Sequence, residues 1–209
     1  MGHKRVVHVI DDEPDVCDAL KLLLDTAGLE ARTYASAEDF LAEVRLSRPI
    51  CLLVDVRLPG MNGLDLVRHL QHGPVRPVVV MITGHGDVPL AVRAMRAGAL
   101  HFLEKPFEPA ELLQTLDEAL QRVSQITAEE ETSAAIEASH RLLTPREQEV
   151  MALLAEGMPT KLLATKLGIS TRTAEHHRAA VLKKMGARTV SHLARMSMIL
   201  QARNAPMRS

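Results

Sequence analysis

Two short segments that are apolar almost throughout, residues 51–55 and 77–83, constrain the fold most strongly. Strands covered on both faces have this composition, whereas half-exposed strands alternate apolar and polar residues. Three more segments rich in Val, Ile and Leu share the first ~120 residues with five helical segments, in strict alternation. The segments are strands at 5–10, 29–34, 51–55, 77–83 and 99–103, and helices at 14–27, 37–45, 63–72, 87–97 and 109–124. This order predicts a doubly wound, five-stranded parallel sheet.

Charge is divided unevenly along the 209 residues, although the net charge is only −1. Residues 1–140 carry 13 Lys and Arg against 22 Asp and Glu, a net charge of −9. Residues 141–209 carry 12 Lys and Arg against 4 Asp and Glu, a net charge of +8. This division indicates an acidic module joined to a basic one, and the basic module is the candidate for binding a polyanion.

The basic module begins with a strong helix start. Thr144 is a good N-cap, Pro145 suits the first helical position, and Glu147 completes a capping box. Three more helices follow, at about 160–167, 171–185 and 189–203, and the first two of them are separated only by the sequence GIS. Two short helices joined by a tight glycine-containing turn predict a helix-turn-helix.

Between the modules, residues 123–140 are acidic and rich in small residues. This stretch could extend the fifth helix or form a flexible tether, and the sequence leaves both open. We expect an acidic domain at 1–122, a linker at 123–140 and a small all-α helix-turn-helix domain at 141–209.

Polar side chains stand at the predicted carboxyl ends of the strands, which meet at one edge of a doubly wound sheet. Crowded carboxylates there repel one another, and Mg²⁺ relieves this while keeping positions for water and phosphate oxygens. A carboxylate beside the ion can attack phosphorus, and a hydroxyl and an ammonium can then donate to the phosphoryl oxygens. These residues are Asp11, Asp12 and Glu13 after the first strand, Asp55 and Thr83 ending the third and fourth, and Lys105 after the fifth.

The motifs at these strand ends occur together in order: DDE at 11–13, DVRLPGMNG at 55–63, TGHGD at 83–87 and FLEKPF at 102–107. In this the chain resembles the receiver domain of two-component response regulators, which has a flavodoxin-like α/β fold. The resemblance implies that Asp55 accepts a phosphoryl group from a sensor histidine kinase. It also implies a Mg²⁺ site made by Asp11, Asp12, Asp55 and the main-chain carbonyl of Arg57.

The same resemblance implies a switch. Thr83 would turn inward to meet the phosphoryl oxygens, Lys105 would pair with them, and Phe102 would rotate and report the change to the surface. The Lys105–Pro106 bond can be cis, because X–Pro bonds have a small trans preference. Asp87 is expected to cap the following helix, and His85 and His101 to be solvated or locally hydrogen-bonded.

The stretch LTPREQEVMALLAEGMPTKLLATKLGISTRTAEHHRAAVLKKMGARTVSHL resembles the DNA-binding domain of LuxR-type regulators. Together with the receiver it makes the chain similar to response regulators of the FixJ/NarL type. Two departures affect the details of DNA contacts: Pro159-Thr160 replaces the usual Ser-Asn, and Ala174 stands where Val is common.

The helix at 171–185 is expected to enter the major groove with its N-terminal turns. Phosphate contacts set affinity, whereas contacts to base edges set sequence choice. Arg172 and Arg178 are further candidate contacts, and Lys184 lies within reach of the phosphates. Backbone contacts are expected from Lys161, Thr171, Thr173, His177 and Lys183, and base-edge contacts from Glu175, His176 and Ala179.

The resemblance further implies double-stranded promoter DNA as ligand, RNA polymerase as a partner, and homodimers formed on phosphorylation. Transcriptional activation is the usual direction in the family. The receiver would assist only its own phosphoryl transfer and dephosphorylation, so the chain is not expected to be an enzyme. Because no apolar run approaches the ~18 residues of a membrane span, we expect a cytoplasmic protein. Cys17 and Cys51 are expected to be buried thiols.

Two other functions fit parts of the sequence. Phosphatases of the haloacid-dehalogenase type also use a strand-end aspartate with Mg²⁺, but they carry a second aspartate where this chain has Arg57, and a cap domain. A DNA-binding regulator whose receiver is controlled without phosphorylation is the other alternative, and the complete acidic set disfavours it.

Overall fold

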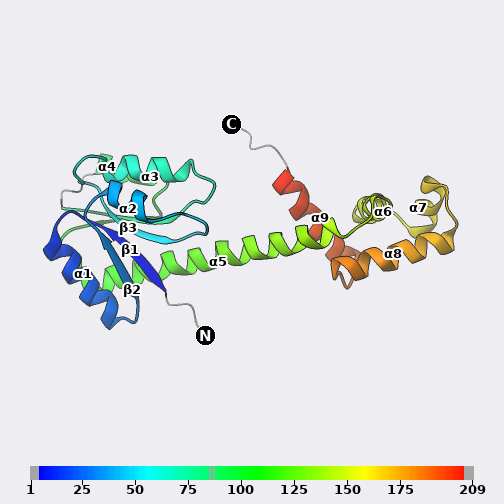
Figure 1. Ribbon diagram of the computed structural model, residues 1–209, viewed down its shortest axis with the longest axis horizontal. Coiled ribbons are helices and arrows are strands. Elements are labelled where there is room, and N and C mark those ends of the chain that lie inside the picture. The colour runs from blue at the N-terminus through cyan, green and yellow to red at the C-terminus, as the bar shows by residue number, and fades with distance from the viewer. Residues whose placement is uncertain (1–4, 85, 87, 205–209) are drawn as a thin grey trace. The chain divides into compact units, whose positions relative to one another are not determined.

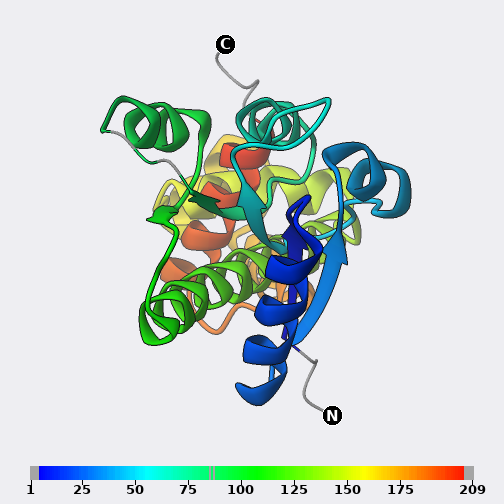
Figure 2. The same cartoon turned by 90° about the vertical axis from the view of Figure 1, so that its left-hand side faces the viewer.

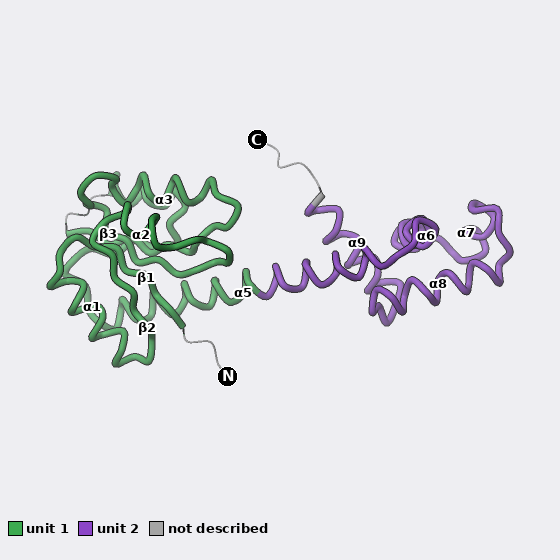
Figure 3. The backbone as a smooth tube through the Cα atoms, in the orientation of Figure 1, with its two compact units in different colours: residues 1–127 green, residues 128–209 purple. Residues whose placement is uncertain are grey.

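The computed structural model describes residues 5–84, 86 and 88–204, so the expectations for His85 and Asp87 lie outside the described residues. The chain divides into two compact units, residues 1–127 (unit 1) and 128–209 (unit 2) (Figure 3). Among the described residues, no helix combines the length and the apolar character that crossing a membrane requires.

Unit 1 contains a parallel sheet of five strands in the order β2-β1-β3-β4-β5. Strands β1, β2 and β3 are labelled in Figure 1. The predicted doubly wound fold is confirmed. The strands are β1 (Val6–Ile10), β2 (Glu30–Tyr34), β3 (Cys51–Asp55), β4 (Val78–Thr83) and β5 (His101–Glu104). The helices are α1 (Pro14–Thr26), α2 (Ala37–Glu43), α3 (Gly63–Gln71), α4 (Val88–Ala97) and α5 (Pro109–Arg141).

Helices cover both faces of this sheet, which explains the apolar strands. Side chains alternate between the two faces of a strand. Leu52 of β3 therefore joins a core with Phe40 of α2 and Leu66 of α3. Its neighbour Leu53 joins the opposite core with α1 and with Leu116 of α5. Figure 2 shows α2, α3 and α4 on one side of the sheet and α1 and α5 on the other.

Helix α5 continues to Arg141, so residues 123–140 are helical throughout. Of the two alternatives that the sequence left open, the extended helix is the one observed. The part of α5 after residue 127 belongs to unit 2, and Ile136 lies in the core of that unit. This helix is therefore built from residues of both units.

Unit 2 also contains α6 (Pro145–Ala155), α7 (Thr160–Leu167), α8 (Thr171–Met185) and α9 (Val190–Asn204). The capping box at Thr144 is present as predicted. Gly168, with a φ of 64°, ends α7, and the side chain of Ser170 caps α8. These two residues form the tight turn of the predicted helix-turn-helix.

Candidate functional site

The carboxyl ends of β1 and β3 bring Asp11 and Asp55 together at the point where the strand order reverses. Lys105, which follows β5, lies between them: its Nζ is 2.6 Å from Oδ2 of Asp11 and 3.2 Å from Oδ1 of Asp55. The three side chains are largely buried, with 0%, 7% and 16% of the surface of Asp11, Asp55 and Lys105 exposed. The sequence placed these residues at one edge, and the structure shows them in contact.

Main-chain groups hold the two carboxylates in place. The Glu13 N–H donates to Oδ1 of Asp11 at 3.0 Å, and the Arg57 N–H donates to Oδ2 of Asp55 at 2.6 Å. The loop after β3 folds back so closely that a Cβ on Gly63 would collide with the main-chain oxygen of Asp55. Sequence reasoning assigned no role to Gly63, although it ends the DVRLPGMNG motif. Its missing side chain is what allows this loop to pack behind Asp55.

Burial and charge act in opposite directions on this cluster. Burial raises the pKa of Asp55 above its usual value, and the Lys105 ammonium and the Arg57 N–H counteract only part of that shift. Burial alone would lower the pKa of Lys105, but the hydrogen bond and charge of Asp11, together with Asp55, raise it overall. The site is therefore a buried, partly compensated set of charges of the kind that functional sites use.

The structure also locates the other residues expected here. Thr83 is fully buried at the end of β4, and its carbonyl accepts the Lys105 N–H at 2.7 Å. Phe102 on β5 is half-buried against the core. The Lys105–Pro106 peptide bond is cis. His101 Nε2 on β5 lies 3.0 Å from Oε2 of Glu118 on α5.

Two carboxylates of this cluster, those of Asp11 and Asp55, are suitable ligands for a Mg²⁺ ion. Among the described residues, no group of three His, Cys, Asp or Glu side chains is arranged to hold a metal. Asp12 is exposed, so the structure does not bring it into the cluster, and its role as a ligand stays a prediction. Asp11 and Asp55 suffice, because Mg²⁺ in proteins commonly takes one or two carboxylates and completes its shell with water and phosphate oxygens.

Unit 2 presents its polar residues on the exposed side of α8. Ala174, Val181 and Met185 point into the core of the unit. Most candidate DNA contacts are exposed, and His177 is half-buried. The hydroxyl of Thr173 lies 2.8 Å from that of Ser170 within the helix cap, so it is partly occupied. The exposed candidates are Lys161, Thr171, Arg172, Thr173, Glu175, His176, Arg178, Ala179 and Lys183.

Lys184 makes a contact within unit 2 that the sequence did not indicate, and its reach to DNA phosphates stays a prediction. Its Nζ lies 2.6 Å from Oε2 of Glu147, which is buried, and also donates to the Leu142 carbonyl. The Lys184 hydrogen bond and the Thr144 N–H lower the pKa of Glu147 to about 2. This pair joins the end of α8 to the start of α6. Sequence reasoning missed it, because the two residues are 37 positions apart.

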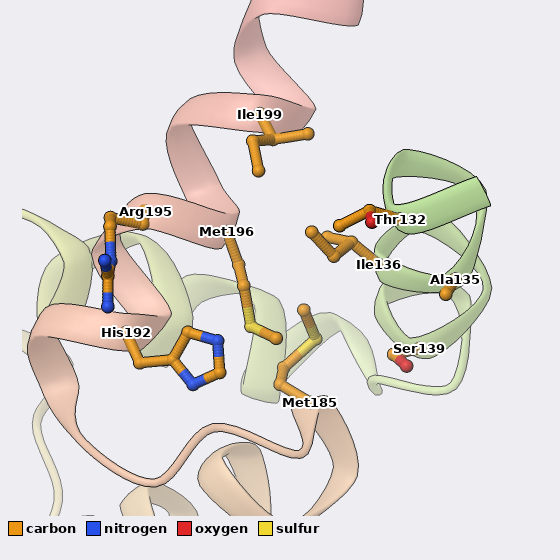
Figure 4. A pocket seen from close by; sticks show the side chains of 9 residues that line it. All are labelled: Thr132, Ala135, Ile136, Ser139, Met185, His192, Arg195, Met196 and Ile199. Atoms are coloured by element: carbon orange, nitrogen blue, oxygen red, sulfur yellow. The ribbon is translucent and has the colours of Figure 1, made fainter. Parts of the chain in front are cut away.

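A groove of about 550 Å³ lies within unit 2, between residues 132–139 of α5 and helix α9. Figure 4 shows Met185 and Met196 side by side, with Ile136 pointing toward them. His192 and Arg195 of α9 also line this groove. The end of α5 therefore contributes to the surface of unit 2 as well as to its core.

Comparison with known proteins agrees with both halves of the structure. Residues 7–117 match the response regulator receiver domain, and residues 141–197 match the luxR family of bacterial regulatory proteins. The chain is 44% identical over 193 residues to the C4-dicarboxylate transport transcriptional regulatory protein DctR of Rhodobacter capsulatus, covering 91% of this chain and 98% of that protein. It is 39% identical to the transcriptional regulatory protein FixJ of Rhizobium meliloti, covering 92% and 94%.

Solved structures give the same result. The response regulator StyR matches with a TM-score of 0.81 and 37% identity, covering 94% of this chain and 99% of that one. Full-length FixJ from B. japonicum matches with a TM-score of 0.57 and 38% identity, covering 96% and 99%. With the strand-end cluster and the helix-turn-helix, these matches show that the chain belongs to the FixJ-type transcriptional response regulators of two-component systems.

Proposed function

We propose that Asp55 is the residue phosphorylated by a sensor histidine kinase, and that its phosphorylation switches the DNA binding of unit 2. The observation that carries this proposal is the contact of Lys105 with both Asp11 and Asp55. Asp55 is then a carboxylate that can attack phosphorus, and Lys105 is a cation that can donate hydrogen bonds to the phosphoryl oxygens. An exposed strand-end aspartate would lack both the cation and the enclosure.

The proposed transfer needs few groups. A carboxylate oxygen of Asp55 forms a bond to phosphorus while the bond between phosphorus and the imidazole nitrogen of the kinase breaks, and the electron pair stays with the imidazole. Lys105 and the Thr83 hydroxyl then donate to the phosphoryl oxygens. The chain assists only this transfer and the later hydrolysis of the phosphoryl group, in which water displaces the Asp55 carboxylate and inorganic phosphate is released, so we do not class it as an enzyme.

Asp11, Asp55 and the main-chain carbonyl of Arg57 would hold Mg²⁺, with Asp12 as a further ligand. The ion would neutralise negative charge on the phosphoryl group during the transfer. Lys105 contacts the carboxylates of both Asp11 and Asp55 and would share them with the ion.

The signal would leave the site through Thr83 and Phe102. Gly86, after β4, is joined to β5, because its N–H donates to Oε1 of Glu104 at 3.0 Å. A Cβ on Gly86 would lie only 3.3 Å from the Phe102 ring. We propose that movement of Thr83 toward a phosphoryl group is passed to Phe102 through Gly86, which lies close to the Phe102 ring.

Exposed apolar side chains in each unit support a homodimer that forms on phosphorylation. Val88 on α4 is 78% exposed, and Val92 and Met95 of the same helix are also exposed. In unit 2, Met198 on α9 is 68% exposed. Burying such side chains between two copies would stabilise a dimer, and a dimer reads two half-sites.

Double-stranded promoter DNA is the proposed ligand of unit 2, which carries the exposed polar face of α8. We further propose that the regulator acts with RNA polymerase as an activator and works in the cytoplasm, where its DNA is found.

Residues 123–140 would be the linker that transmits the change between a receiver domain at 1–122 and a DNA-binding domain at 141–209.

The test is incubation of the full chain with acetyl phosphate and Mg²⁺, followed by mass spectrometry. The wild type should gain the mass of one phosphoryl group, and Asp55→Asn should not. Asp25→Asn, which changes an exposed aspartate of α1, is the matched control and should behave as the wild type. An equal mass gain in Asp55→Asn would refute the assignment.

Sedimentation and promoter binding by the same samples test the switch. Phosphorylated wild type should dimerise and bind promoter DNA more tightly than Asp55→Asn. If phosphorylation occurs but neither property changes, the alternative of a receiver controlled without phosphorylation gains support.

A further inference from the structure

A second cluster of charge lies in unit 1, in a groove of about 680 Å³ between the C-terminal ends of α3 and α4. Arg68, Arg76, Arg93 and Arg96 line it, and we call these four residues the arginine groove. All four side chains are exposed. The cluster combines residues from two helices and from the loop before β4.

Hydrogen bonds of Gln71, which lines the groove, connect the ends of α3 and α4. The Gln71 amide donates to the carbonyls of Pro77 and Gly98, at 3.4 and 3.3 Å. Gly98 has a φ of 103°, and a Cβ there would lie 2.9 Å from Gln71. These contacts fix the distance between the two helix ends, so the groove has a defined width.

The arginine groove is separate from the phosphoacceptor site. Pro77 and Gly98 precede β4 and β5, so the groove lies at the amino ends of these strands. Asp55 and Lys105 lie at the carboxyl ends. The length of a strand of this size, roughly 15–20 Å, separates the two.

The charge of the groove is unusual for its surroundings. Residues 1–140 have a net charge of −9, yet residues 58–103 contain these four arginines against two acids, Asp65 and Asp87. Among the described residues, Arg68 has an ion pair, with Asp65 at 3.0 Å, and the other three arginines have none. Arg96 in the last turn of α4 complements the helix dipole, but Arg76 in the loop and Arg93 further up α4 do not.

We propose that the arginine groove binds a small multivalent anion that carries phosphate or carboxylate groups. Guanidinium groups bind such oxygens in pairs, which makes arginine the preferred residue for them. The volume is within the usual range of small-molecule sites. The net charge of +8 on residues 141–209 makes the chain's own basic domain a poor occupant of a groove lined by arginines. This inference does not depend on the phosphorylation of Asp55.

The test is NMR titration of the full ¹⁵N-labelled chain with pyrophosphate and, separately, with citrate, at about 0.15 M salt, where weak surface attraction is screened. The amide of Gly98 reports on the groove and distinguishes it from the basic residues of unit 2. The wild type should show a saturable shift at Gly98 with at least one probe. Saturation with pyrophosphate alone assigns phosphate ligands, and saturation with citrate alone assigns carboxylates.

Variants make the test specific. Arg93→Gln/Arg96→Gln should weaken binding at Gly98 by about tenfold or more, since each charge-assisted contact is strong. Arg93→Lys/Arg96→Lys keeps the charge but loses the paired geometry, and should weaken binding by less. Arg45→Gln/Arg48→Gln removes the same charge from exposed residues elsewhere in unit 1 and should leave binding unchanged.

Three results would overturn the proposal. The first is a shift at Gly98 that does not saturate with either probe. The second is equal binding by wild type and Arg93→Gln/Arg96→Gln, with unchanged melting temperatures showing that both are folded. The third is a groove that responds to duplex DNA and to neither small anion, which would make it a contact for a nucleic-acid backbone.

Discussion

The two charged sites of this protein differ in how their side chains are held. In unit 1, Lys105 contacts Asp11 and Asp55 in a largely buried cluster. In unit 2, Lys161 and most candidate DNA contacts are exposed. Buried charges must find partners inside the fold, so their arrangement is set before any ligand arrives. Exposed charges have no such requirement, and DNA itself completes their arrangement.

The comparison is sharpest for two lysines. Lys105→Met should lower the free energy of unfolding at pH 7 by about 3 kcal/mol, because it leaves two buried carboxylates without their cation. Lys161→Met, on the exposed surface, should change it by less than about 0.5 kcal/mol. Urea denaturation with EDTA present measures both. Equal losses would mean that burial does not distinguish the two sites.

Glu147 is the exception in unit 2, because it is buried and paired with Lys184. Lys184→Met should lower the melting temperature of unit 2, whereas Lys183→Met, its exposed neighbour, should leave it unchanged. The measurement is thermal unfolding followed by the amide signals of α6 and α8. A similar effect of both variants would show that the pair with Glu147 contributes nothing particular.

The pH dependence of the two buried acids should have opposite signs. The pKa of Glu147 is lowered to about 2 from 4.5, so its contribution to stability is complete above about pH 4.5 and is lost as the pH falls toward 2. The pKa of Asp55 is raised, so its ionisation disfavours the folded state as the pH rises through that pKa. Carboxyl ¹³C titrations of the two residues would measure both directions, and shifts of the same sign would contradict the assignment.

A stability measurement follows from the raised pKa. Asp55→Asn should raise the free energy of unfolding at pH 7, by roughly 1 kcal/mol, because it removes a charge whose burial is unfavourable. Asp25→Asn, at an exposed position, is the control and should have no effect. Loss of stability in Asp55→Asn would show that the contact with Lys105 outweighs the cost of burial.

The smallest effect is expected for single phosphate contacts on the DNA side. Lys161→Met and Lys183→Met should each lower promoter affinity about threefold and reduce the slope of log affinity against log salt by about 1. Lys105 belongs to unit 1 and not to the DNA-binding face of α8, so Lys105→Met should leave the slope of log affinity against log salt unchanged. Fluorescence anisotropy at several salt concentrations measures the slopes.

Local sequence patterns predicted the fold well, for a physical reason. The apolar strand at 51–55 and its alternation with helices depend on neighbouring residues, as do the caps at Thr144 and Ser170. The strand-end positions of Asp55 and Lys105 follow from the same alternation, because parallel strands end at the same edge. Periodicity and capping act over a few residues, so they can be recognised in the sequence alone.

Other features required the tertiary structure. The pairing of Lys184 with Glu147 spans 37 positions, and the arginine groove unites residues from two helices and a loop. The continuous helix through residues 123–140 was left open by a sequence compatible with both a helix and a tether, and the structure places Ile136 of this segment in the core of unit 2. The sequence by itself determined which elements form and at which edge the acids collect. Only the folded structure decided which charges meet, because side chains distant in the chain are brought into contact by the packing of whole elements.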